Sequence, residues 1–353
     1  MPAGVRKGKR GVRAPREARD GRLRIPSTKV LYSGAMTVVT TDTEITLVRE
    51  AHRAIVSPWG AALRRYFWLS SSGEERDIVW GYSGGANKKG GQGDVLIPFP
   101  GRIADGRYVF GGETFQLERN DKEGPNAIHG FVRALPWQVV SSAADAVQFA
   151  VHLSAEHYGP KGYPFSLAVR LSYRLTDDGL SCAFEIENDG ARAAPVGAGF
   201  HPYFTVGTSR ADEAELTIPA ARYLAFNDRL VPTGAILPAD GTEWDYRVSR
   251  AIGPRRFNHC YVDLARDAEG VATASLRNPA NGRMVDLVMD RSFSALVVYT
   301  GDAIPGAARH AVAIEPMTCP TDAFNHPEWG SLALAPGRAA AGRFAVRSRM
   351  GPA

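Results

Sequence analysis

The chain has 353 residues, of which 44% are hydrophobic and 22% are charged, as in globular proteins with a buried core. The formal net charge is +5, but residues 1–29 hold ten Lys and Arg against two acidic residues, so this segment carries +8 and the remainder −3. No window approaches the roughly 18 apolar residues of a membrane helix, which excludes a spanning helix and predicts a soluble protein.

The basic N-terminal segment lacks apolar periodicity, so we expect residues 1–35 to form a disordered extension. It has no apolar core of the kind that secretory signals contain. Contact with nucleic acid or an anionic surface through this segment alone is the least favoured interpretation, because the rest of the chain is acidic. Met36 precedes the first patterned segment and is a plausible true start, and residues 36–353 are expected to form one domain.

Short strands separated by turn residues follow from Met36 onward. The clearest is a hairpin, in which 167–175 and 180–186 alternate apolar and polar residues around a turn at 176–179. A second hairpin at 107–117 turns at Gly111 and Gly112. A glycine- and lysine-rich stretch, 81–93, is expected to be a flexible loop and not a phosphate-binding loop, since it has neither the spacing nor a following helix. Further strand-like runs are 45–48, 54–56, 65–69, 147–153, 261–264, 295–299, 311–314 and 344–346. Many strands with few, short helices predict an all-β antiparallel sandwich.

A strand of four apolar residues, 311–314, runs directly into Glu315 and Pro316. Because proline cannot donate to a strand ladder, we expect Glu315 to lie where the strand leaves its sheet, facing a pocket as a base or forming a structural ion pair. Other polar residues that interrupt the apolar pattern are Arg102, His129, His201 and Asn258, each with a structural alternative. His201, followed by Pro202 and flanked by aromatic residues, has a setting in which its pKa can be tuned.

Two other chemistries fit these residues poorly. None of the eight histidines stands at the short spacing of a metal site, so we predict no metal. The chain also lacks the GxSxG motif of many serine hydrolases. Cys182, Cys260 and Cys319 are odd in number and widely spaced, which predicts reduced thiols in a cytoplasmic protein. A Glu base and a His acid can move protons between two oxygens of one substrate without a cofactor.

At these residues the sequence resembles the aldose 1-epimerase (galactose mutarotase) family. The matching motifs, in order, are Gly101 and Arg102, NAIHG at 126–130, Gly162 to Pro164, Asn188 with Gly199, FHPYF at 200–204, Val298 to Gly301, and IEPMTCPTDAFN at 314–325. The resemblance implies a β-supersandwich and a cofactor-independent isomerase acting on a hexose or related aldose. It further implies His201 as general acid, Glu315 as general base, and Arg102 and His129 as ligands of sugar hydroxyls.

Catalysis of this kind requires an ionised Glu315 and a protonated His201, and we expect each charge to favour the other. Two positions depart from the family pattern: Asn258 replaces an Asp, and Val297 replaces a Gln. Asn258 can still bind a hydroxyl, whereas Val297 cannot, which puts galactose as the substrate in doubt. A carbohydrate-binding protein without catalysis is therefore the alternative. Trp59, Trp80 and Trp137 are further candidates for stacking on a sugar, although core or rim positions are favoured. The sequence leaves open a monomer or a homodimer.

Overall fold

A computed structural model describes residues 43–329 and 332–349. All of them belong to one compact unit, residues 39–353. The predicted disordered extension, residues 1–35, and Met36 lie outside the described residues, so the expected domain boundary stays a prediction.

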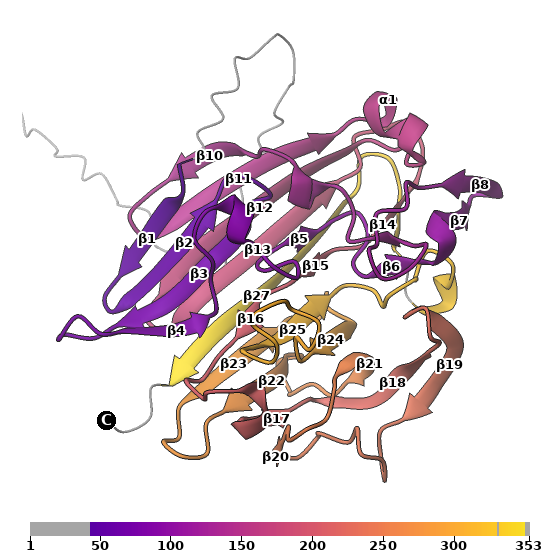
Figure 1. The fold of residues 1–353 in the computed structure, drawn as a ribbon. Coiled ribbons are helices and arrows are strands. Elements are labelled where there is room, and N and C mark those ends of the chain that lie inside the picture. Colours follow the sequence, from indigo (N-terminus) through magenta and orange to yellow (C-terminus); the bar gives the residue numbers. More distant parts are fainter. Residues whose placement is uncertain (1–42, 330–331, 350–353) are drawn as a thin grey trace, which may run out of the picture. The chain divides into compact units, whose positions relative to one another are not determined.

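Two large antiparallel sheets make up most of the described structure (Figure 1). The first has twelve strands, in spatial order β1 (Ile45–Arg49), β2 (His52–Ser57), β3 (Ala62–Leu69), β4 (Glu75–Val79), β16 (Tyr203–Phe204), β25 (Val312–Met317), β24 (Ala295–Tyr299), β21 (Asn258–Leu264), β18 (Ala220–Phe226) and β19 (Pro232–Pro238), with β15 (Gly199–Phe200) and β5 (Val95–Leu96) joined beside β25. The second has nine strands, in the order β10 (Gln138–Ser142), β11 (Ala146–Leu153), β12 (Leu167–Thr176), β13 (Gly179–Glu187), β27 (Ala339–Arg349), β23 (Met284–Met289), β22 (Ala272–Arg277), β17 (Glu215–Thr217) and β20 (Arg250–Ala251).

The remaining elements are short. Three two-stranded ribbons pair β14 (Ala194–Val196) with β26 (Leu332–Leu334), β6 (Arg102–Ile103) with β9 (Ala127–Ile128), and β7 (Arg107–Phe110) with β8 (Glu113–Gln116). The described helices are α1 (Ala155–Tyr158) and the 3-10 turns Gly85–Asn87, Ala104–Gly106, Val132–Ala134, Gly159–Lys161, Ala211–Glu213 and Pro327–Trp329. The predicted all-β antiparallel fold with few, short helices is therefore confirmed.

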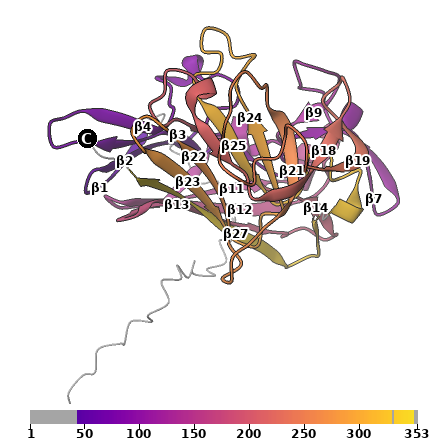
Figure 2. The same cartoon turned by 90° about the horizontal axis from the view of Figure 1, so that it is seen from below.

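The alternating strand pattern determines how the two sheets pack. In the hairpin of β12 and β13, Thr176 pairs with Gly179 across the predicted turn, and the apolar face of β13 is buried. This face meets the twelve-stranded sheet, since the Phe184 ring lies 5.8 Å from that of Phe200, which in turn lies 4.9 Å from that of Phe344. Figure 2 shows β21, β24 and β25 in one layer, with β12, β13 and β27 in the other. One hydrophobic core joins both layers.

The strand that carries Glu315 does not end where the sequence suggested. β25 continues through Glu315 and Pro316 to Met317, so the expected exit of the strand at Glu315 is wrong. The backbone N–H groups of Ile314 and Thr318 point to the side of β15 and β16, where they donate to Pro202 and Ala198. Pro316 falls between them, opposite the end of β15, where the ladder needs no N–H from it.

Candidate active site

All five predicted site residues line one cleft of about 1360 Å³: Arg102, His129, His201, Asn258 and Glu315. They come from β6, the turn after β9, the junction of β15 and β16, and the central strands β21 and β25. More than two hundred positions separate the first from the last along the chain. The structure therefore brings these five predicted side chains together.

The register of the central sheet builds the floor of this cleft. Glu315 pairs directly with Val297 on β24, and Val297 pairs with Cys260 on β21. Directly paired residues of antiparallel strands place their side chains on the same face, about 5 Å apart. The carboxyl group of Glu315 therefore has an apolar neighbour, Val297, on the face that it presents to the cleft. In the next row of the sheet, Tyr299 pairs with Asn258.

His201 occupies the interruption between β15 and β16, held by main chain on both sides. Its N–H donates to the carbonyl of Asp94 at 3.0 Å, and its carbonyl accepts from the N–H of Gly93 at 2.9 Å. Its ring stacks on Tyr203 with centroids 5.0 Å apart. Gly91, at φ +76°, lies against the same ring, so that a Cβ there would be 3.1 Å from Cδ2 of His201. These contacts fix the imidazole.

The imidazole of His201 and the carboxyl of Glu315 are in contact. Nε2 of His201 lies 3.3 Å from Oε1 of Glu315, and the two residues are 5% and 3% exposed. Burial raises the pKa of Glu315 to about 8 and lowers the pKa of His201 to about 3. In addition, Nδ1 of His201 is buried without a hydrogen-bond partner among the described residues.

The expectation that each charge would favour the other is therefore not met. Desolvation outweighs their mutual attraction, so the neutral pair, with the proton on Glu315, is favoured near pH 7. The positive charges of Arg133 and Lys88 lower the pKa of His201 further. The pair nevertheless holds one proton in total, which is the number that one acid and one base need.

His129 presents a fixed hydrogen-bond donor to the cleft. Its backbone is left-handed, at φ +66°, in the glycine-containing turn predicted from NAIHG. Its Nδ1 accepts from the N–H of Gly101 at 3.2 Å, so in the neutral ring the proton is on Nε2. Burial holds the pKa of His129 well below its usual value, with smaller contributions from His201 and two arginines. The ring centroids of His129 and His201 are 5.5 Å apart.

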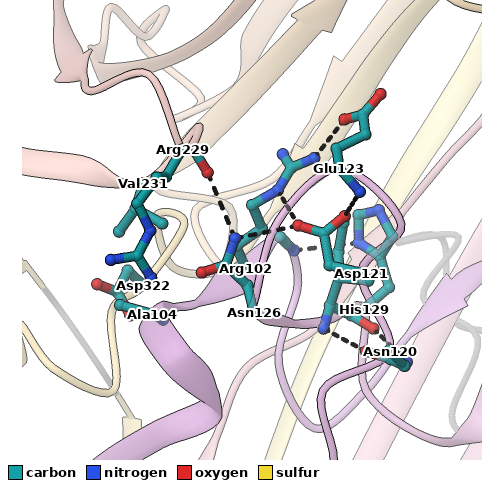
Figure 3. Close-up of polar contacts among 12 residues, drawn as sticks. Arg102, Ala104, Asn120, Asp121, Glu123, Asn126, His129, Arg229, Val231 and Asp322 are labelled. Carbon is teal, nitrogen blue, oxygen red and sulfur yellow. Dashed lines mark hydrogen bonds and ion pairs between the residues drawn. The ribbon is translucent and has the colours of Figure 1, made fainter.

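Arg102 is oriented by two carboxylates (Figure 3). Its Nε donates to Asp121 at 2.7 Å, and one terminal nitrogen donates to Glu123 at 2.6 Å. Asn126 donates to the same Asp121 oxygen at 3.1 Å, which holds the carboxylate in place. The pKa of Asp121 is lowered, since hydrogen bonds from Arg102, Glu123 and Asn126 outweigh the effect of burial. The guanidinium thus reaches the cleft in one orientation and keeps a terminal nitrogen for a ligand.

A cluster of charges beside His201 was not predicted from the sequence. The buried carboxylate of Asp94 accepts from Lys88 and, at 3.2 Å, from Arg133, and all three residues line the cleft. Burial raises the pKa of Asp94 although both cations oppose the shift. Lys88 lies within the stretch interpreted as a flexible loop, 81–93, and Asp94 follows it directly. Gly91 of that stretch packs against the ring of His201. The one available signal was an acid directly after a glycine-rich run.

The structure gives three further results on the predicted chemistry. The described residues contain no group of three or more His, Cys, Asp or Glu that could hold a metal ion. Cys182, Cys260 and Cys319 are buried and free. Within 43–329 and 332–349, no helix is long and apolar enough to cross a membrane.

Comparison with known proteins gives a consistent result. The aldose 1-epimerase family model matches residues 43–347. The uncharacterized protein YihR of Escherichia coli K12 is 32% identical over 234 residues, covering 66% of this chain and 71% of its own. The galactose mutarotase of Mus musculus is 28% identical over 308 residues, covering 79% of this chain and 86% of its own. The regions aligned with YihR and with the mouse galactose mutarotase each include most of the described residues.

Solved structures agree on the fold. The GalM/aldose epimerase homologue from C. elegans superimposes with a TM-score of 0.79 at 18% identity, covering 88% of this chain and 100% of its own. The galactose 1-epimerase of Lactobacillus acidophilus gives a TM-score of 0.72 at 20% identity, covering 88% and 95%. The implied galactose mutarotase-like β-supersandwich is therefore confirmed. With the family model matched over nearly all of the described residues, the chain belongs to the aldose 1-epimerase family of isomerases.

Proposed function

We propose that this protein is an aldose 1-epimerase that interconverts the α and β anomers of a hexose or related aldose through Glu315 and His201. The observation that carries the proposal is the buried contact between their side chains at the floor of the cleft, 3.3 Å apart. This pair holds one proton and has room for a sugar above it. A pair of this kind can serve both oxygens of one hemiacetal.

The reaction follows from the positions of the two groups. Glu315 takes the proton of the C1 hydroxyl, the bond between C1 and the ring oxygen breaks, and His201 gives its proton to that oxygen. The open aldehyde rotates about the C1–C2 bond, and the reverse proton transfers close the ring on the other face of C1. No atom or electron is gained or lost overall. Each acid or base group contributes on the order of 10²- to 10⁴-fold.

Sugar binding has to move the proton of the pair from Glu315 to His201 before the reaction. Hydroxyl groups near the carboxylate supply the hydrogen bonds that burial has removed, and this lowers the pKa of Glu315. The charge of Arg102 already acts on Glu315 in the direction of a lower pKa. Burial thus keeps the proton on Glu315, and the substrate completes the active form.

The other site residues are proposed to orient the sugar. Arg102 and His129 offer N–H donors from one side of the cleft, held by Asp121 and Gly101 respectively. From the floor, Asn258 offers its side-chain amide, which makes no hydrogen bond to another described residue. Val297 offers no polar group, so a hydroxyl placed over it would lose its hydrogen bonds to water, at a cost of about 1–3 kcal/mol. The preferred aldose presents C–H groups at that point.

Relaxation of a freshly dissolved α-anomer, followed by polarimetry or NMR, tests the proposal. Glu315→Gln and His201→Asn should each lose most of the catalysed rate while circular dichroism stays unchanged. The matched control is His157→Asn, the same change at an exposed histidine of α1 that does not line the cleft. An unchanged rate in the Glu315 variant would end its assignment as the base.

A carbohydrate-binding protein without catalysis is the second candidate. The apolar Val297 next to Glu315 and the uncharged Asn258 favour it, because both positions face the cleft without charge assistance for a hydroxyl. Saturable sugar binding in calorimetry, without faster anomer exchange for any aldose, would establish this alternative. The three free, buried thiols support the proposed cytoplasmic location. A monomer or a homodimer remains the prediction.

A further inference from the structure

The rim of the cleft carries an exposed tryptophan. Trp59, between β2 and β3, is 53% exposed and lines the same cleft as Glu315. A large aromatic side chain usually buries most of its surface, so an exposed ring at a binding cleft is a candidate contact for a ligand. Neither the proposed reaction nor the hydrophobic core makes use of it.

The main chain holds Trp59 rigidly in place. Trp59 forms an isolated β-bridge with Pro136. Both of its neighbours bond to the same segment: the carbonyl of Pro58 accepts from the N–H of Trp137 at 2.9 Å, and the N–H of Gly60 donates to the carbonyl of Leu135 at 2.7 Å. Gly60 has φ +72°, and a Cβ there would lie 2.6 Å from the carbonyl oxygen of Arg133. The ring of Trp59 therefore belongs to the wall that carries Arg133.

We call the side of the cleft formed by Trp59, Tyr82, Lys88 and Arg133 the outer wall. It also offers N–H donors that are not used in other hydrogen bonds. Asp94 takes one donor from Lys88 and one from Arg133, which leaves further N–H groups on both cations. The two side chains are 21% and 25% exposed. Tyr82 lines the cleft near them, with Lys88 Nζ 6.0 Å from the centre of its ring. An apolar ring face beside several donors matches a sugar, which has C–H groups on its faces and hydroxyls at its edge.

Charge and size together indicate what the outer wall accepts. The numbers of positive and negative side chains that line the whole cleft are nearly equal. Four are cations and five carry carboxyl groups: Lys88, Arg102, Lys122 and Arg133, with Glu44, Asp94, Asp121, Glu123 and Glu315. This balance favours an uncharged ligand. At about 1360 Å³ the cleft also exceeds the roughly 300–1,000 Å³ of most small-molecule sites, so a single pyranose leaves much of it empty.

We propose that Trp59, Lys88 and Arg133 form an outer subsite for a second sugar ring, so that the substrate is the reducing end of a neutral oligosaccharide. This rests on the proposed function, which places C1 at Glu315 and the ring oxygen at His201. Asp94 is bonded to His201 through its main chain and to Lys88 and Arg133 through its side chain, so the outer wall continues from the ring-oxygen side. A second ring joined through C4 or C6 of the first extends in that direction.

The test compares glucose and galactose with their 4-linked and 6-linked disaccharides. For the wild type, kcat/KM for at least one disaccharide should exceed that of its monosaccharide. Trp59→Ala should lower kcat/KM for that disaccharide about tenfold, or ~1.4 kcal/mol, and leave the monosaccharide value unchanged. Trp59→Phe keeps a flat ring and should retain the preference. Val248→Ala, at a side chain that is 78% exposed and outside the cleft, is the control.

Calorimetric titration of the same sugars keeps the two proposals separable. Catalysis of monosaccharides without any disaccharide preference, or an equal loss for both in Trp59→Ala, would overturn the outer subsite and leave the proposed function intact. If no sugar relaxes faster, the proposed function fails. Disaccharide binding about tenfold tighter than monosaccharide binding, lost in Trp59→Ala, would then still support the subsite, and equal binding would overturn it.

Discussion

Raising the pH above about 8 should inactivate the enzyme, because the shared proton is then lost. Burial raises the pKa of Glu315 to about 8 and lowers that of His201 to about 3, so the pair holds one proton between these limits. From the upper value, about 90% of the free enzyme has the proton at pH 7, half at pH 8 and about 9% at pH 9. Since kcat/KM reports the free enzyme, it should be level from about pH 5 to 7 and fall about tenfold per unit above 8.

The assay is anomer relaxation by NMR exchange at several sugar concentrations, between pH 5 and pH 10. Hydroxide accelerates the uncatalysed reaction, so the rate with Glu315→Gln at each pH serves as the blank. A kcat/KM that rises with pH through 8 would refute the reasoning. It would mean that the ionised carboxylate of Glu315 works without a proton on His201, and that the two groups do not share one proton.

Three further predictions concern the same site. The pKa of Glu315 in the folded protein lies above its ordinary value. The wild type therefore has its full stability at a pH below the ordinary pKa and loses stability as the pH rises towards 8. Glu315→Gln should match the wild type in Tm at pH 5 and exceed it at pH 9, where its free energy of unfolding should be larger by up to about 5 kcal/mol. Equal Tm values at pH 9 would contradict the buried carboxyl. Gly91→Ala should displace the ring of His201 and reduce kcat, whereas Gly84→Ala, at another positive φ but with no atom within 4 Å of its Cβ, should cost about 1–3 kcal/mol of stability and leave kcat unchanged. If both variants keep full activity, the contact with His201 is unimportant. Arg102→Lys cannot hold both carboxylates, so KM should rise about tenfold with little change in kcat; an unchanged KM would remove Arg102 from sugar binding.

Local patterns were enough to predict the class of the fold. Alternation in 167–186 predicted the buried faces of β12 and β13, and the turn at Thr176 to Gly179 matches the observed pairing. The order of the strands was beyond the sequence, because pairing between distant segments depends on the whole packed structure. The continuation of β25 past Pro316 shows the same limit. A proline breaks a strand only where a neighbouring strand needs its N–H, and the position of the neighbours is not a local property.

The site was predicted in part. Each of the five residues interrupts an apolar run, and the resemblance supplied their roles, whereas their convergence in one cleft required the sheet order. The cluster of Lys88, Asp94 and Arg133 was missed because charged residues near a glycine-rich run are usually solvated, whereas Asp94 is buried beside His201 and Arg133 comes from a distant segment. The pKa expectation failed for a related reason. Spacing along the chain says which charges are near, but the depth of burial decides which protonation state is favoured.

The place of the last strand has a consequence for how the protein is made. β27, residues 339–349, lies in the middle of the nine-stranded sheet, with β13 on one side and β23 on the other. While a ribosome still holds these residues in its exit tunnel, the two halves of that sheet have nothing between them. Synthesis of β27 therefore supplies the strand that unites them, and a nonsense codon before Ala339 would leave the sheet in two separate parts.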